Sequence, residues 1–262
     1  MIQPKDEFVV EIGKQRLRVL DYARVSYEQG LAQQRAFVEQ VIAGEPAEHV
    51  LVLLEHDPVV TVPPKQSAQA HLVASPAQLK RLGIEVCETD RGGDITYHGP
   101  GQLVAYPILK LSSFNLNLSK YMRLLEQMVI QTLAAYGVAG HREQGATGVW
   151  VDPQHFSIDA PSGSIAGAGE SGARDADGLL GVTEKICAMG VRIRKNTTLH
   201  GIGFNLSTDL SHFQTIVPCG LAGRPVTSLT TLLGEYAPSM QNFKRTLTGC
   251  LADQLESAIA AK

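Results

Sequence analysis

Long apolar runs are missing from this 262-residue chain, although 44% of its residues are hydrophobic. No stretch reaches the roughly 18 to 20 apolar residues that a membrane-spanning helix needs. The first residues, Met-Ile-Gln-Pro-Lys-Asp-Glu, also lack the charged-then-apolar pattern of a secretory signal. These absences predict a cytoplasmic protein.

Cysteine is scarce, with four residues that form no Cys-x-x-Cys pair: Cys87, Cys187, Cys219 and Cys250. So few cysteines in a chain of this length argue against a disulfide scaffold and predict reduced thiols. The eight histidines show neither His-Glu-x-x-His nor a Cys/His ligand spacing, so we expect no metal. A formal charge of −3 argues against extensive nucleic-acid binding.

Length and hydrophobic content fit one large α/β domain with a sizeable core. Caps and apolar periodicity predict helices over residues 26–43, 75–83, 119–137 and 239–261. Strands are expected over residues 49–55, 84–89, 182–195 and 198–206. Because no regular βαβ rhythm is present, the sheet should be mixed or mostly antiparallel, with helices packed on it.

Cys219 lies between Pro218 and Gly220, in a setting that suits an exposed turn, and Lys185 precedes it by 34 residues. A thiol attacks as the thiolate, and a nearby ammonium lowers its pKa, so the two residues could carry acyl transfer. From the spacing alone, a small buried cysteine and a surface lysine are the commoner case, because such a pair often occurs by chance. Cys187 is a rival nucleophile, because alternation in a strand would place it on the same face as Lys185. We prefer Cys219, since Cys187 has the apolar neighbours of a packed residue.

A glycine-rich segment, Arg-Gly-Gly-Asp-Ile-Thr-Tyr-His-Gly-Pro-Gly-Gln, starts at Arg91. Its glycines let backbone approach a ligand closely, and Thr96 and His98 would lie on one face of the strand between them. The same pattern would also fit a tight hairpin. His98 and His200 could each be structural, and the glycine neighbours of His98 make it the better candidate for a substrate contact.

The chain closely resembles the lipoyl(octanoyl) transferase family over about residues 53–233. The resemblance rests on this segment, on Lys185, on the run His-Gly-Ile-Gly-Phe-Asn from His200 and on the Pro-Cys-Gly around Cys219. The resemblance implies the core fold of biotin and lipoate protein ligases, and transfer of an octanoyl group from acyl carrier protein through an acyl-thioester. The acceptors would be lysines of lipoyl-domain proteins, namely 2-oxoacid dehydrogenase E2 subunits and the glycine cleavage H protein, with no cofactor. The resemblance also implies that Cys219 is the nucleophile and that Lys185 is its activating partner. The substrate pocket would be lined by Arg91, Gly92, Gly93, Asp94, Ile95, Thr96, Tyr97, His98, Ala188, Met189, Gly190, Gly201, Ile202 and Gly203.

The chain departs from the family pattern twice. Relatives usually carry Thr-x-Gly-Arg where this chain reads Thr-Val-Pro-Pro-Lys from Thr61, and the two prolines stiffen that loop. Residues 153–181 form a longer stretch than expected, with 6 Gly and 4 Ser among 29 residues and no apolar periodicity. We interpret it as a flexible insertion in a single catalytic domain.

Other functions remain open from the residues. An ATP-dependent lipoate or biotin ligase would share the Arg91–His98 segment but would not need the Pro-Cys-Gly nucleophile. A non-catalytic module that binds lipoyl domains or acyl carrier protein would not need Cys219 and Lys185. A papain-like hydrolase is disfavoured, because that chemistry pairs cysteine with histidine.

Overall fold

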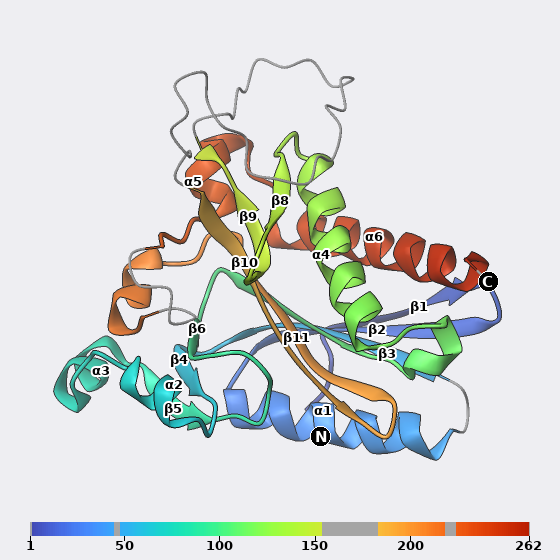
Figure 1. Ribbon diagram of the computed structural model, residues 1–262, viewed down its shortest axis with the longest axis horizontal. Helices are drawn as coiled ribbons and strands as arrows, with labels where there is room; N and C mark the ends of the chain where they lie inside the picture. The colour runs from blue at the N-terminus through green and yellow to red at the C-terminus, as the bar shows by residue number, and fades with distance from the viewer. Residues whose placement is uncertain (1, 45–47, 154–182, 218–223, 262) are drawn as a thin grey trace.

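The computed structural model describes residues 2–44, 48–153, 183–217 and 224–261. An eight-stranded sheet in the order β1-β2-β3-β7-β11-β10-β9-β8 runs through the molecule (Figure 1). A three-stranded sheet, β5-β4-β6, lies beside it. The strands of the large sheet are β1 (Asp6–Ile12), β2 (Gln15–Val25), β3 (Glu48–His56), β7 (Gln102–Ile108), β8 (Gly140–Glu143), β9 (Ala146–Val151), β10 (Glu184–Arg194) and β11 (Thr197–Asn205). Those of the small sheet are β4 (Val59–Val62), β5 (Glu85–Glu88) and β6 (Thr96–His98).

The described pairings are mostly antiparallel, as predicted. Strand β2 pairs with β3 in parallel and β4 with β5 in parallel, whereas the other paired strands are antiparallel. The fold class expected from the sequence is therefore confirmed. The stretch 153–181, interpreted above as an insertion, lies outside the described residues except for Pro153.

Three predicted helices begin at the serines that the sequence indicated, whereas the helix predicted from residue 119 is capped by Asn117, which the sequence analysis did not indicate. Ser26 caps α1 (Tyr27–Ala43), and its hydroxyl accepts a hydrogen bond from the Gln29 amide while the Gln29 side chain accepts one from the Ser26 amide. The same reciprocal arrangement starts α3 (Pro76–Leu82) at Ser75. Helix α4 (Leu118–Ala134) is capped by Asn117, and α6 (Met240–Ala260) by Ser239. Shorter helices are α2 (Gln66–Ala70), α5 (Leu229–Leu233), η1 (Leu111–Phe114), η3 (Leu210–Thr215) and η5 (Gly234–Tyr236).

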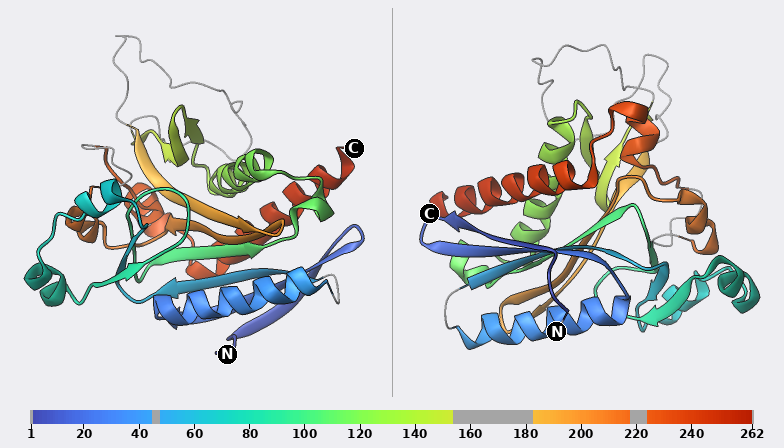
Figure 2. Two further views of the ribbon diagram at one scale, coloured as in Figure 1. Left: turned by 60° about the horizontal axis from the view of Figure 1, so that its bottom comes forward. Right: turned by 180° about the vertical axis from the view of Figure 1, so that it is seen from behind.

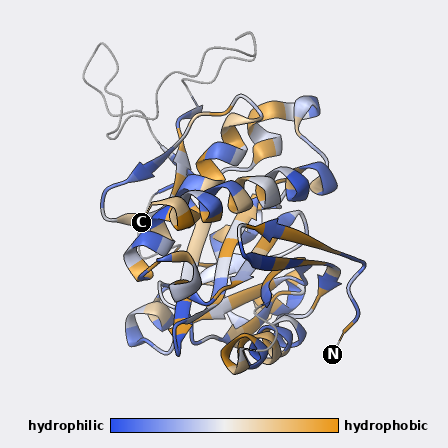
Figure 3. Cartoon of the chain, turned by 90° about the vertical axis from the view of Figure 1, so that its right-hand side faces the viewer, coloured by the Kyte–Doolittle hydropathy of each residue, from blue (hydrophilic) through white to orange (hydrophobic). Residues whose placement is uncertain are grey.

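Helices cover both faces of the large sheet (Figure 2). Strand β3 shows why, because its residues alternate between two apolar clusters. Val50, Val52 and Leu54 pack with Phe37 of α1. Leu51 and Leu53 belong to the larger cluster on the opposite face, with residues of α4 and α6. The helices carry hydrophobic and hydrophilic residues along their length, as expected of helices that bury one side (Figure 3). No described helix is long and apolar enough to cross a membrane.

The small sheet packs on a third apolar cluster that includes Tyr97 of β6 and Phe213 of η3. Strand β6 therefore has two different faces. Tyr97 points into this cluster, whereas Thr96 and His98 line a cavity between the small sheet and strands β10 and β11. The prediction that Thr96 and His98 share a face is confirmed.

Candidate active site

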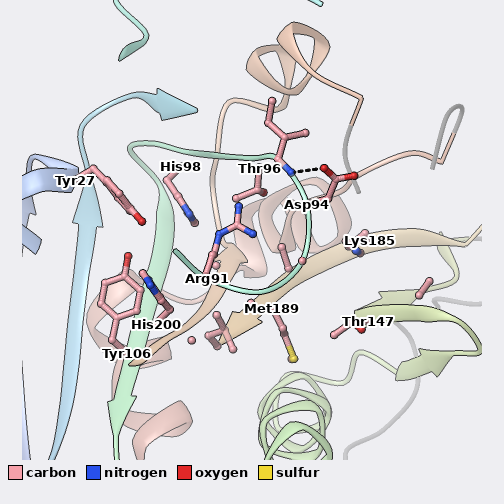
Figure 4. Close-up of a pocket in the computed structure, with 18 of the residues that line it drawn as sticks. Tyr27, Arg91, Asp94, Thr96, His98, Tyr106, Thr147, Lys185, Met189 and His200 are labelled. Carbon is pink, nitrogen blue, oxygen red and sulfur yellow. Dashed lines mark hydrogen bonds between the residues drawn. The ribbon is translucent and has the colours of Figure 1, made fainter. Parts of the chain in front are cut away.

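A cavity of about 270 Å³ lies between the loop that carries Arg91, strand β6, and strands β10 and β11 (Figure 4). Its lining residues are Tyr27, Arg91, Gly93, Asp94, Ile95, Thr96, His98, Tyr106, Gly145, Ala146, Thr147, Lys185, Ala188, Met189, Gly190, His200, Gly201, Ile202 and Gly203. Lys185, Asp94 and Thr147 are drawn at one end, and Tyr27, Tyr106 and His200 at the other (Figure 4). Apolar side chains, including Ile95, Met189 and Ile202, line part of the wall.

Lys185 is buried on β10, with 5% of the residue exposed. Its Nζ lies 4.8 Å from the centre of the Trp150 ring, and the Arg224 guanidinium lies 4.1 Å from the same ring. Trp150 is itself fixed, because its Nε1 donates a hydrogen bond to the Ala146 carbonyl. A Cβ at Gly148 would approach the Lys185 Cε to 3.1 Å, so glycine leaves room for the lysine stem. The lysine is thus held at the cavity by packing and a cation–π contact.

The prediction that Lys185 and Cys187 share a face is wrong. Lys185 pairs with Trp150 and Cys187 with Val149, so β10 holds one extra residue between these pairs, a β-bulge. The bulge breaks the alternation, and Cys187 lies in the large apolar cluster instead of lining the cavity. Burial raises the pKa of the Cys187 thiol well above its ordinary value, which disfavours the thiolate. The structure therefore supports the interpretation of Cys187 as a packed residue.

Cys219 lies outside the described residues, but the chain on both sides of it is placed. Before it, the Val217 amide donates a hydrogen bond to the His71 carbonyl, with N and O 2.8 Å apart. After it, the Lys185 amide donates to the Pro225 carbonyl and the Thr227 amide donates to the Lys185 carbonyl. The backbone that follows Cys219 is therefore bonded directly to Lys185.

Glycines in the Arg91 loop and in strand β10 let the two backbones approach each other closely. The Gly92 amide donates to the Val191 carbonyl, and a Cβ at Gly190 would lie 2.7 Å from the Gly92 carbonyl oxygen. Arg91 is oriented by hydrogen bonds from its guanidinium to the Thr61 hydroxyl and the Gly92 carbonyl. Glycine at position 190 is therefore needed for the contact between the loop and the strand.

Of the residues expected to line a substrate pocket, Gly92 and Tyr97 do not line the cavity. Gly92 packs against β10, and the Tyr97 hydroxyl lies 2.7 Å from His212 Nδ1 on the other side of β6. The other expected residues do line it: Arg91, Gly93, Asp94, Ile95, Thr96, His98, Ala188, Met189, Gly190, Gly201, Ile202 and Gly203. Their binding of substrate stays a prediction.

The end remote from Lys185 is polar and aromatic. The Tyr27 hydroxyl donates to the Thr89 hydroxyl, and the Tyr106 hydroxyl lies 2.8 Å from His56 Nε2. Burial lowers the pKa of His98 to about 3, so this imidazole is neutral near pH 7. Sequence reasoning missed Tyr27 and Tyr106, and also Gly145, Ala146 and Thr147, because nothing local in the sequence links α1, β7 or β9 to the cavity.

His200 lines the cavity in a left-handed backbone conformation, with φ of 61°. Its amide donates to the Gln34 side chain, and its Nε2 lies 2.7 Å from Asp90 Oδ1. Burial lowers the pKa of His200, and the Asp90 carboxylate opposes that shift. Strain at a buried cavity residue points to a constraint on its position. Among the described residues, no group of three or more His, Cys, Asp or Glu side chains could hold a metal ion.

Comparisons with known proteins show which family the chain belongs to. The model of the lipoyl protein ligase A/B catalytic domain matches residues 26–252. An octanoyltransferase of Chloroflexus aggregans is 38% identical over 237 residues, which cover 90% of this chain and 94% of that protein. An octanoyltransferase of Chloroflexus aurantiacus is 44% identical over 191 residues, or 72% of each chain. These relatives support the predicted octanoyl transfer over the ligase alternative.

Solved structures share the fold at low sequence identity. A crystal structure of lipoate-protein ligase A bound with ATP aligns with a TM-score of 0.64 at 16% identity, over 90% of this chain and 84% of that one. A bi-partite lipoate protein ligase from Thermoplasma acidophilum aligns with a TM-score of 0.60 at 16% identity, over 89% of this chain and 83% of that one. The lipoate-ligase core predicted from the sequence is thereby confirmed. The chain belongs to the family of lipoyl protein ligase A/B catalytic domains.

Proposed function

We propose that this protein transfers an octanoyl group from acyl carrier protein to a lysine of a lipoyl domain, through an acyl-thioester on Cys219. The family and its octanoyltransferase relatives support the reaction. One observation carries the assignment of residues: Lys185 lines the cavity, and its backbone bonds to the segment that follows Cys219. We further propose that the chain is a single catalytic domain, with residues 153–181 as an insertion, acting in the cytoplasm.

The first step forms the acyl-enzyme. The Cys219 thiolate attacks the carbonyl carbon of the donor thioester, a new C–S bond forms, and the donor thiolate leaves. The Lys185 ammonium gives its proton to that thiolate. The donor is already an activated thioester, so this step needs no ATP. Burying the six methylenes of an octanoyl chain would contribute roughly 4 to 5 kcal/mol before ordering costs, at about 0.8 kcal/mol each.

The second step transfers the acyl group. The acceptor amine attacks the thioester carbon, the C–N bond forms, and the C–S bond to Cys219 breaks. The proton on the attacking nitrogen passes to neutral Lys185, which restores the starting ammonium. The ligase structures share this chain's fold at 16% identity, and that likeness does not carry their use of ATP.

Intact-mass spectrometry after incubation with octanoyl-acyl carrier protein, without ATP, tests the reaction. The wild type should gain the mass of one octanoyl group, and Cys219→Ala should gain none. Acylation of Cys219→Ala would refute the assignment of the nucleophile. A gain seen only with octanoate and ATP would favour the ligase.

A second measurement tests Lys185. The ammonium of Lys185 should favour the Cys219 thiolate, so Lys185→Met should move iodoacetamide alkylation of Cys219 to higher pH. Peptide mapping separates Cys219 from the three other cysteines. An unchanged profile in the variant would mean that another group activates the thiol.

A further inference from the structure

Asp94 is the one carboxylate among the residues that line the described part of the cavity. The loop that carries it runs along β10 toward Lys185: the Gly92 amide bonds to the Val191 carbonyl, and a Cβ at Gly93 would lie 3.9 Å from the Met189 carbonyl oxygen. Figure 4 draws Asp94 at the Lys185 end of the cavity. A negative charge therefore lies at the end where we place the acyl transfer.

Two groups contact the Asp94 carboxylate, and one of the two contacts, from the Ile95 amide, has hydrogen-bond geometry. Its Oδ1 accepts a hydrogen bond from the Ile95 amide, with N and O 2.7 Å apart. Its Oδ2 lies 2.8 Å from Nδ1 of His71, which follows helix α2. A carboxylate can accept about four hydrogen bonds, so these two contacts leave room for a further donor. Both side chains keep some exposure, 20% for Asp94 and 26% for His71, so a partner's side chain can reach them.

His71 also lies beside the chain that leads to Cys219. Its carbonyl accepts the bond from the Val217 amide, and the Val73 amide donates to the Thr215 carbonyl. Leu72 and Ile216 form an isolated antiparallel bridge between the same two segments. The His71–Asp94 pair thus links the cavity wall to the backbone that ends at Val217, two residues before Cys219.

The second step of the proposed reaction brings a cation to this end. An acceptor lysine arrives mostly as the ammonium, while Lys185 is neutral because it has given its proton to the donor thiolate. The bound ammonium loses one proton to solvent before it attacks as the amine, and the second proton passes to Lys185 as the C–N bond forms. A carboxylate at the same end attracts the ammonium and gives it a charge-assisted hydrogen bond. The acyl donor presents a thioester with no cation, so it gains nothing from the carboxylate.

We propose that Asp94 binds the ε-ammonium of the acceptor lysine before transfer, and that His71 is a positioning residue that orients Asp94. This inference rests on the proposed function, since it concerns the second step. It assigns acceptor recognition to a pair that is separate from the nucleophile and from Lys185.

The test compares two nucleophiles on the octanoylated enzyme. Deacylation by a lipoyl domain, whose lysine is cationic, is measured against deacylation by hydroxylamine, which is neutral near pH 7. Asp94→Asn should lower the rate ratio of lipoyl domain to hydroxylamine by roughly tenfold to a hundredfold, the effect of losing one hydrogen bond to a charged group. His71→Gln should lower the same ratio by a smaller factor. Asp209→Asn is the matched control, because Asp209 lies 3.8 Å from His212 but does not line the cavity.

An unchanged ratio in both variants would overturn the inference. An equal loss with both nucleophiles would overturn it too, because a merely structural role slows every deacylation alike. If Asp94→Asn fails to fold, His71→Gln decides by the same ratio. Absence of the acyl-enzyme in the wild type would refute the proposed function, and this is seen before any nucleophile is added.

Discussion

At the scale of single residues, the environment of a thiol decides whether it can act as a nucleophile. Cys187 is fully buried in the large apolar cluster, and burial raises the pKa of its thiol. Although Cys187 is only two residues from Lys185 in the sequence, this environment does not favour it as a nucleophile. The same lysine forms backbone bonds with Pro225 and Thr227, six and eight residues after Cys219.

Cys187→Ala should retain most acyl transfer and lower the free energy of unfolding by about 1 kcal/mol, because it removes one buried atom and leaves a small cavity. Urea unfolding and transfer assays on the same preparation measure both effects. Cys219→Ala is the matched variant and should behave in the opposite way, with normal stability and no acyl-enzyme. Loss of turnover in Cys187→Ala alone would reverse the ranking of the two thiols.

The sequence predicted the residues that carry local signals and missed those that enter from distant elements. Arg91, Lys185 and Gly203 stand in runs whose glycines and charge can be recognised in order along the chain. Tyr27 reaches the cavity as the first residue of a helix, and Tyr106 from the middle of β7, so neither is marked by its neighbours. The left-handed conformation of His200 depends on tertiary contacts, which no local pattern reveals.

At the scale of elements, the same contrast separates helices from strands. Helices α1, α3 and α6 begin beside Ser26, Ser75 and Ser239, because a serine cap and the turn that follows it are local. Strand β10 was predicted over nearly its observed length, but its bulge was not. A bulge depends on the pairing with β9, and strict alternation within β10 cannot indicate it.

Gly201 shows how closely two of these strands approach one another. A Cβ there would lie 2.1 Å from the Ala105 carbonyl oxygen of β7, so Gly201→Ala must move β7 and β11 apart. We expect a loss of about 2 kcal/mol in the free energy of unfolding, within the usual range for overpacking. Urea unfolding measures it.

Gly249→Ala is the control for that variant. Gly249 is exposed in α6, and nothing lies within 4 Å of an added Cβ, so alanine should stabilise the helix by up to about 1 kcal/mol. Equal effects of the two substitutions would mean that the strands can separate without cost.

At the scale of the whole molecule, the order of the strands in the sheet could not be predicted from the sequence. Strand β7 lies between β3 and β11, which are about 50 residues before it and 90 residues after it along the chain, so the centre of the sheet is built from distant segments. Mostly antiparallel pairing was predicted because strands and helices do not alternate regularly along the chain. That observation does not indicate which strands are neighbours in the sheet.

Three buried histidines make the stability of the whole fold depend on pH. Burial lowers the pKa of His49 to about 4, of His56 to about 4 and of His98 to about 3. The unfolded chain binds protons on these groups below about pH 6.5, whereas the folded chain does not until the pH approaches those lowered values. The free energy of unfolding should therefore fall as the pH drops from about 7 toward 4, by about 1 kcal/mol per histidine between pH 7 and 5.5.

His49→Gln isolates one of these contributions, because His49 packs against Phe114 and does not line the cavity. Urea unfolding at pH 7 and 5.5 should show a smaller pH dependence in the variant, by about 1 kcal/mol. An identical pH dependence in both proteins would mean that His49 binds a proton as readily in the folded state as in the unfolded state.

The predicted insertion, residues 153–181, is flanked by β9 and β10, which pair in the sheet, so the insertion is a candidate for deletion. Val151 of β9 and Glu184 of β10 are paired antiparallel neighbours, so a two-residue Asn-Gly turn can join the chain near Asp152 to Thr183. Replacing the stretch shortens the connection, and loop closure changes by only about 0.6 kcal/mol for each halving of length. We expect the deletion variant to keep its Tm within a few degrees and to acylate Cys219 at a normal rate, because the bonds between Lys185 and Pro225–Thr227 remain. Any defect should fall on transfer to the lipoyl domain, measured by mass spectrometry of the acceptor. A variant that unfolds, or that no longer forms the acyl-enzyme, would show that the stretch belongs to the folded core of the enzyme.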